Sequence, residues 1–446
     1  MIHAAVATQD HVQAASGQGI RRGSLDVSII LAFLTGVFVQ LSMPLTDLYE
    51  VPNVRAVYFA LILGIFALRF LGGQPIRMNS FLLISYLVLS AVLAVGIAYS
   101  RAPVYGTTKV ILVCSYFWLL GIVIYNLVDD DASGKGFLAG LFVGGLLLVG
   151  ITAIEFGNPI QLLQNTNRFF RLRFGEDGNP ILLGRHLALA ITIIVTYVAV
   201  RRRWIDLTWS IPVGLLAFVY LVATGSKGPL LALLCSFVVT PLLMLRGFVV
   251  KLALSVVIMG LSLFVAVGAL EFLPKEFIEE RFTEKVQNLS LRMPAYQDVV
   301  RALLESDAIQ MLIGHGTGDY GYFALGHDGR AYPHNVLLEV AYENGLIGVG
   351  LLIAALACPL VAVVRGTQQT PEYRHRMLLA GLTASYIAAV INAQFSGDLG
   401  ANLFIGTFGA ALTSLARVQT WGQINVRATQ YESPFQTTMR LPGGKQ

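Results

Sequence analysis

The sequence predicts an all-α protein that crosses a membrane many times. Hydrophobic residues fill 55% of its 446 positions and charged residues only 13%, whereas a soluble domain carries about 25% charged residues. Apolar runs of about 20 residues, the length that spans a bilayer as a helix, recur along the chain, and the mean hydropathy is +0.68. A membrane β-barrel would instead show short segments of alternating hydrophobicity.

About twelve of these runs can be placed as membrane spans. They cover residues 27–43, 54–71, 81–99, 110–127, 137–156, 180–200, 210–224, 229–245, 248–273, 346–364, 377–395 and 399–416. Residues 1–26 are polar, and the first run leads into no small-residue cleavage site, so we expect no cleavable signal. The prediction is therefore one transmembrane domain over 27–417, with a polar segment before it and a tail, 418–446, that we expect to be disordered.

Basic residues predict how the chain is oriented. In this scheme they gather on one side of the membrane and in the C-terminal tail, at Arg21, Arg22, Arg77, Arg201, Arg202, Arg203, Arg246, Lys251, Arg365, Arg374, Arg376, Arg427, Arg440 and Lys445. The positive-inside rule makes that side cytoplasmic and places both termini there. The acidic segment 129–131 lies on the same side, but acidic residues count little in the rule. Cations placed in this way do not indicate a nucleic-acid partner.

The opposite side carries three polar connections, over residues 157–179, 225–228 and 274–345. The first contains Arg171 and Arg173 and the second Lys227, and positive charge on this outer side opposes the orientation rule. An anionic ligand would account for it. The third connection is too long for an unstructured linker, and we expect helices at 276–286, 293–304 and 334–344, a glycine-rich break at 314–318, and Gly345 as the stop of the last helix.

Two residues of the long connection are candidates for chemistry. His334 titrates near neutrality and could take a proton from an acceptor hydroxyl, although a histidine at a helix start can simply bond the backbone. Arg292 lies at a predicted helix start, where the guanidinium and the backbone N–H groups could bind a phosphate together. The alternative for Arg292 is a solvated loop arginine.

Two further candidates lie close to the bilayer. Lys227 stands between glycines with almost no room between two spans, so it either snorkels or binds something. Arg185 and its neighbour His186 lie in the first turns of a span, where snorkelling and ligand binding are equally plausible.

No metal site or disulfide framework is expected. Asp129 and Asp131 form a D-x-D pattern in a short cytoplasmic turn, and His315 and His327 lack ligand spacing with His334. The three cysteines, Cys114, Cys235 and Cys358, lie far apart inside apolar runs and are expected to be small core residues.

Taken together, residues 165–405 resemble the O-antigen ligase and polymerase family of bacterial envelope glycosyltransferases. Five segments carry the resemblance in order: Arg173 to Pro180, the helix start 224–233, Arg292 followed by Tyr296, the glycine turn 313–318, and His334-Asn335 through Glu339 and Glu343 to Gly348. The last is the most specific. The chain departs from the family pattern at Lys227, where an arginine is usual, so a planar fork is replaced by a point charge.

The resemblance implies a fold similar to the lipid-dependent class C glycosyltransferases, in the bacterial inner membrane, with the active face in the periplasm. It implies metal-independent, cofactor-free transfer with inversion, from a glycan on undecaprenyl diphosphate to a lipid A core or a growing polysaccharide. His334 would be the catalytic residue. The residues implied to bind the diphosphate are Arg292, Lys227, Arg185, Arg173 and Arg171, and those implied to position the acceptor or the loop are Asn335, Glu339 and Tyr296.

Three functions remain open on the sequence. We favour an O-antigen ligase slightly over an O-antigen or exopolysaccharide polymerase. All of these use the same kind of donor, so the shared motifs do not separate them. A polysaccharide transporter or flippase is the distant alternative. It would show inverted repeats and charges at the bilayer midplane, whereas the ionisable residues of this chain gather at one face and no repeat is visible.

Overall fold

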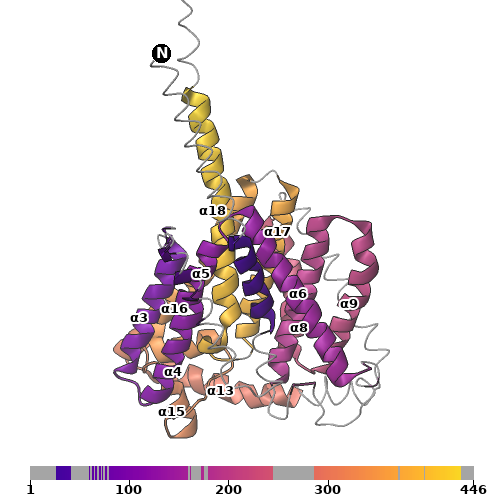
Figure 1. The fold of residues 1–446 in the computed structure, drawn as a ribbon. Helices are drawn as coiled ribbons and strands as arrows, with labels where there is room; N and C mark the ends of the chain where they lie inside the picture. The colour runs from indigo at the N-terminus through magenta and orange to yellow at the C-terminus, as the bar shows by residue number, and fades with distance from the viewer. Residues whose placement is uncertain are drawn as a thin grey trace, which may run out of the picture.

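A computed structural model describes residues 27–41, 80–158, 172–174, 179–244, 286–369, 372–395 and 397–432, together with residue 161 and scattered residues between 60 and 77. Side chains at 244, 286–292, 368–369 and 418–432 lie outside this description. The described part is a helical bundle (Figure 1). Six of its helices are long and apolar enough to cross a membrane and four more are shorter and apolar. The chain is thus a polytopic membrane protein.

These helices coincide with ten of the predicted spans. They are Val27–Leu41, α3 (Phe81–Ile97), the continuous segment Pro103–Leu127, α6 (Asp131–Phe156), α8 (Pro180–Arg201), α9 (Trp204–Ala223), α10 (Lys227–Met244), α16 (Val336–Gln369), α17 (Tyr373–Ala393) and α18 (Leu403–Glu432). The other two predicted spans, 54–71 and 248–273, fall wholly or mostly outside the described residues. The total of about twelve therefore stays a prediction.

The span predicted at 110–127 begins earlier than expected. It consists of α4 (Pro103–Val113), one π-helical stretch (Cys114–Leu119) and α5 (Leu120–Leu127). Pro103 starts the helix, because its fixed φ and missing N–H suit the first helical position. The sequence Gly-Thr-Thr-Lys at 106–109 lowers the local hydropathy and hides this start. The extension brings Lys109 inside the helix and into the protein interior, where it is 1% exposed.

Glycines allow the first helix to pack closely on α6. A Cβ atom at Gly136, Gly140 or Gly144 would lie 2.9, 1.9 or 2.8 Å from a backbone oxygen of the helix Val27–Leu41. The four-residue spacing puts these glycines on one face of α6. Such small-residue faces let backbones approach where lipid supplies no hydrophobic drive between helices.

Gly345 divides α16 into two helical segments, as the sequence predicts for the stop of its first segment. Its φ of 61° and ψ of −160° are not helical. The break leaves the carbonyls of Tyr342 and Glu343 without helical partners, and the backbone N–H groups of His315 and Gly316 donate to them at 3.0 and 2.9 Å. The predicted glycine turn at 314–318 therefore caps the break in α16.

The conformation of Gly345 sets the first test. Its φ and ψ belong to a region that only glycine adopts readily, and a Cβ there would lie 2.4 Å from the backbone oxygen of Leu312. We expect Gly345→Ala to lower the free energy of unfolding by about 3 kcal/mol, measured by thermal denaturation in detergent. Gly350→Ala is the control, because it lies in the same helix with open space around it. It should be neutral or slightly stabilising, and equal stability of the two variants would contradict the strain at Gly345.

The loop connecting the spans contains three further helices. They are α13 (Val286–Glu305), α14 (Ala308–Ile313) and α15 (Asp319–Leu325). The helix predicted at 293–304 is therefore present and starts seven residues earlier, whereas the one predicted at 276–286 lies outside the described residues. In Figure 1, α13 and α15 lie at the end of the bundle opposite to the one where α18 leaves it.

At the end of the bundle that the sequence predicts to be cytoplasmic, the acidic turn 129–131 contacts nearby basic side chains. Asp129 pairs with Arg77 at 3.8 Å, and Asp131 contacts Lys135 and accepts a hydrogen bond from His375 Nδ1 at 3.1 Å. Asp130 caps α6 through the backbone N–H of Ser133. The D-x-D pattern thus has a structural use, and no group of three potential metal ligands occurs among the described residues.

The tail prediction differs from the structure over its first part. Disorder was expected after residue 417, but α18 continues as a helix to Glu432. The apolar stretch of α18 ends at Arg417, and the following residues extend the helix without an apolar run. The remaining residues, 433–446, lie outside the described part.

Candidate functional site

One end of the bundle gathers the polar candidates. The end of α3, the starts of α4, α8, α10, α16 and α18, and the end of α17 meet there, and the loop helices α13–α15 cover them (Figure 1). The short segment 394–402, which contains the 3-10 helix Leu399–Ala401, joins α17 to α18 at this end. The described parts of the three predicted outer connections therefore lie at the same end of the bundle.

His334 lies immediately before α16 in an unusual backbone conformation. Its φ is 58°, in the left-handed region that few residues other than glycine adopt. Asn335 follows it and accepts a hydrogen bond from the Leu338 N–H at 2.9 Å, which caps α16. The imidazole ring packs edge-on against Tyr332, with 4.7 Å between ring centroids. Backbone strain of this kind is stored where the surrounding structure fixes a side chain.

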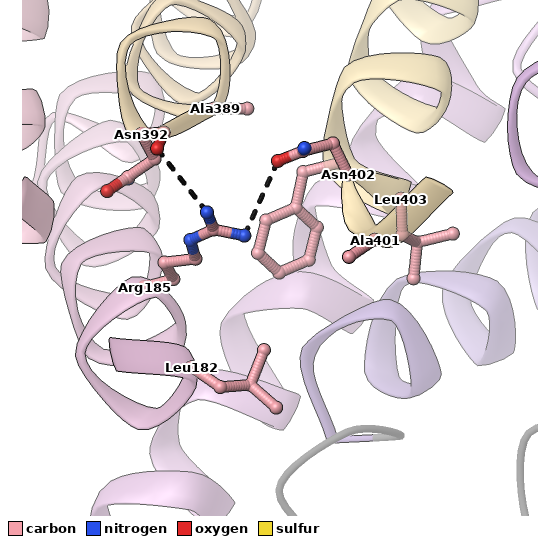
Figure 2. Close-up of a pocket in the computed structure, with 8 residues that line it drawn as sticks. Leu182, Arg185, Ala389, Asn392, Ala401, Asn402 and Leu403 are labelled. Atoms are coloured by element: carbon pink, nitrogen blue, oxygen red, sulfur yellow. Dashed lines mark hydrogen bonds between the residues drawn. The ribbon is translucent and has the colours of Figure 1, made fainter. Parts of the chain in front are cut away.

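Arg185 reaches from the second turn of α8 into a small pocket (Figure 2). Its guanidinium donates to the backbone oxygen of Asn392 at 3.3 Å and to Oδ1 of Asn402 at 3.4 Å. The side chain is buried, so snorkelling to bulk water does not describe it. Leu182, Ala389, Ala401, Leu403 and Phe404 complete the wall. The enclosed space of about 10 Å³ is roughly what one water molecule needs.

Asp398 is the acidic centre of this region. It is buried, and its carboxylate accepts from the Tyr105 hydroxyl at 2.9 Å, from Arg330 Nε at 3.2 Å and from the backbone N–H of Ala401 at 2.7 Å. Arg185 lies close enough to interact with the same carboxylate electrostatically. Asp398 thereby ties α4, the loop before α16 and the start of α18 together.

Tyr332 is the shared neighbour of three functional groups. Its ring contacts His334, the guanidinium of Arg330 lies 5.7 Å from its centroid, and Arg185 interacts with it electrostatically. Burial raises the pKa of the Tyr332 hydroxyl, so Tyr332 stays neutral at physiological pH. Burial lowers the pKa of Arg330 and Asp398 raises it, with a net upward shift that keeps Arg330 charged.

The turn that carries Lys227 packs beside Arg185. A Cβ at Gly184 would meet Thr224 Oγ1 at 3.1 Å, and one at Gly228 would meet Phe395 Cβ at 3.2 Å. Lys227 itself is exposed at the first position of α10. Arg173 also lies near this turn, because the N–H of its neighbour Leu172 donates to the carbonyl of Ala223, the last residue of α9, at 3.3 Å. The Arg173 side chain is exposed.

Glu339 has a buried partner that the sequence does not predict. Lys109 Nζ lies 2.5 Å from its Oε1 and donates to Glu343 at 2.6 and 2.7 Å, while the backbone N–H of Leu399 donates to Oε2 of Glu339 at 3.2 Å. All three charged side chains are no more than 1% exposed. Glu339 thus serves to hold α16, which fits a positioning residue better than one that contacts the acceptor.

The other predicted residues are placed only in part. Tyr296 is half-buried on α13, the helix that packs on α16. Arg292 lies on the same helix, and the prediction that it stands at a helix start is wrong, because α13 begins at Val286 and the free N–H groups of its first turn precede Arg292. The side chain of Arg292 is outside the described part, and Arg171 lies outside it altogether. Their expected roles stay predictions.

Four site residues escape the sequence reasoning: Lys109, Tyr105, Arg330 and Asp398. Hydropathy starts the predicted span at residue 110, one residue after Lys109. Lys109 is therefore not recognised as an intramembrane lysine, although such a lysine is a signal for a functional site. Arg330 and Asp398 carry no local pattern. Their pairing joins positions 68 residues apart.

Chemically, the region combines a fixed imidazole with cations set in advance around one aromatic side chain. Such a set can accept a proton from a hydroxyl and stabilise a leaving group that gains negative charge. Lys109 pairs with Glu339 and Glu343, and the exposed Arg330 pairs with Asp398, a carboxylate with which Arg185 also interacts electrostatically.

A comparison with known protein families identifies the central part of the chain. The O-antigen ligase model matches residues 212–353, which is less than half of the chain and runs from within α9 to the early turns of the second segment of α16. It includes Lys227, His334 and Glu339 and excludes Arg185 and Asp398. The resemblance expected from the sequence is confirmed over this region. A search of curated proteins returned no match.

Proposed function

We propose that this protein is a bacterial envelope glycosyltransferase that moves a glycan from undecaprenyl diphosphate to a sugar hydroxyl, and that it acts as an O-antigen ligase with lipid A core as the acceptor. The family match supports a ligase or polymerase working on lipid-linked glycans. The apolar bundle provides the environment in which a polyprenyl chain can be held. The active face would be periplasmic, with both termini in the cytoplasm.

One observation carries the proposal: His334, Arg330 and Arg185 surround the side chain of Tyr332. His334 and Arg330, both inside the matched region, thus meet Arg185, a cation from outside it, at one place. This arrangement fits a reaction between a neutral hydroxyl and a lipid diphosphate, because one partner must lose a proton while the other gains charge.

In the proposed reaction the acceptor oxygen attacks the anomeric carbon of the donor sugar from the face opposite the diphosphate. The new C–O bond forms as the bond to the diphosphate oxygen breaks, so the configuration inverts. His334 takes the hydroxyl proton and releases it to the diphosphate or to water. Arg185, with Lys227 and Arg330 nearby, stabilises the charge that develops on the leaving diphosphate.

The test is a gel of surface polysaccharide from a deletion strain, complemented with the wild-type gene or with a His334 variant. Bare lipid A core, with polymer accumulating on its lipid carrier, is expected for the deletion and for the variant. Core capped by a single repeat unit would contradict the ligase and indicate a polymerase. A normal ladder with loss of a secreted polymer would indicate an exopolysaccharide pathway.

A further inference from the structure

Lys109 is the most deeply buried lysine or arginine among the described side chains, and the proposed reaction does not use it directly. It lies on α4, and its ammonium contacts two carboxylates on the first segment of α16: it donates to both oxygens of Glu343 and lies 2.5 Å from Oε1 of Glu339. Its Nζ also lies 4.8 Å from the centroid of the Tyr105 ring. An intramembrane lysine is costly to bury unless it is paired, and it usually has a function.

The two glutamates face Lys109 because of helical spacing. Positions 339 and 343 are four residues apart, so their side chains lie one above the other on one face of the helix. Val336 and Val340 are buried alongside them. Apolar packing would tolerate a small slide of this helix, whereas the ion pairs would not, because a slide would leave buried charges unpaired.

The contacts of Lys109 with Glu339 and Glu343 form a clamp, and the first segment of α16 depends on this clamp for its position. It is only about two turns long, and the break at Gly345 separates it from the rest of α16. At the N-terminal end of this segment Asn335 caps the helix, and His334 directly precedes Asn335 in the chain. Any displacement of the segment therefore displaces His334.

The clamp is also joined to the pocket side of the region. The backbone N–H of Leu399 donates to Glu339, and its neighbour Asp398 binds Arg330 and Tyr105. Tyr105 lies one turn before Lys109 on α4. Lys109 is thus the residue at which α4, α16 and the segment leading into α18 are held in register.

We infer that Lys109 is a positioning residue for glycosyl transfer: its ammonium clamps Glu339 and Glu343 and thereby holds His334 in the reactive geometry. The inference rests on the proposed function. It assigns no substrate contact to Lys109. Transfer should therefore lose rate rather than donor affinity when the clamp is removed, because Arg185 and Lys227 lie on other helices.

The test uses the full-length protein in lipid nanodiscs, with a lipid-linked glycan donor and its acceptor. Lys109→Met alone leaves two buried carboxylates unpaired and is expected to fold poorly. The triple variant Lys109→Met, Glu339→Gln, Glu343→Gln carries no unpaired buried charge. We expect it to accumulate normally, to lose about 10²-fold in kcat, and to keep its donor KM within a few-fold of wild type. Amide hydrogen exchange should become faster over residues 336–344.

His375→Gln is the matched control, because His375 is a fully buried residue that contacts a carboxylate, Asp131, at the opposite end of the bundle. Its kcat should equal that of wild type. A triple variant with wild-type kcat, beside an active wild type, would overturn the role of Lys109 and leave the proposed function intact. A wild-type protein that transfers no glycan would overturn the proposed function instead, and faster exchange over 336–344 would then still support the clamp.

Discussion

Replacing His334 with asparagine should lower kcat for glycosyl transfer by about 10²–10⁴-fold, the loss expected when a general base is removed. Asparagine is the sharpest choice because it tolerates the left-handed backbone that His334 adopts, with φ of 58°. It keeps a polar side chain of similar reach but cannot take a proton near neutral pH. The measurement is the initial rate of transfer by purified protein, normalised to the amount of folded enzyme.

The same loop offers a control. His327 is exposed, and its Nδ1 lies 3.1 Å from the carbonyl of Leu325. His327→Asn should transfer at nearly the wild-type rate. If His334→Asn were as active as His327→Asn, the imidazole of His334 would have no part in proton transfer, and the histidine would only terminate the loop before α16.

The second large effect is expected at Arg185. Removing its guanidinium with Arg185→Gln should lower kcat/KM for the lipid diphosphate donor by about 10²–10³-fold. The cation is buried and held by Asn392 and Asn402, so its charge acts in a medium where water screens it little. Asp398 keeps its bonds from Tyr105, Arg330 and Ala401, which should preserve the fold around the pocket.

Two comparisons test whether the burial of Arg185 increases its effect on transfer. Arg173 is exposed, so Arg173→Gln should cost only a few-fold, because solvent weakens each exposed charge. Arg203→Gln, an exposed change just beyond the opposite end of α8, should have no effect on either kinetic constant. Equal losses at Arg173 and Arg185 would mean that the pocket contributes nothing beyond net charge.

Local pattern predicts the spans well and their ends poorly. Hydropathy places a helix at ten described spans, because a segment in lipid must satisfy its own backbone and so must be helical. It fails at the start of α4, where polar residues 106–109 lie inside the helix and two of them, Gly106 and Lys109, face other protein rather than lipid. A hydropathy average cannot distinguish these two surroundings.

Glycine signals predict where a helix stops and where a loop turns, but not which segments those positions contact. Gly345 was expected to stop a helix and does so, and the glycine turn 314–318 was expected as a break. That the turn caps the carbonyls exposed by Gly345 follows only from the packing of two segments almost 30 residues apart.

The sequence by itself determined that this is a polytopic helical membrane protein with its polar residues gathered at one face. It also determined a family resemblance over residues 165–405, which the family comparison confirms over residues 212–353. These properties follow from composition and from motifs read along the chain. Only the tertiary structure decided that Lys109 pairs with Glu339 and Glu343, and that Asp398 joins Arg330 and Tyr105. Contacts between residues far apart in the sequence depend on which segments become neighbours, and the packing of the whole bundle decides that.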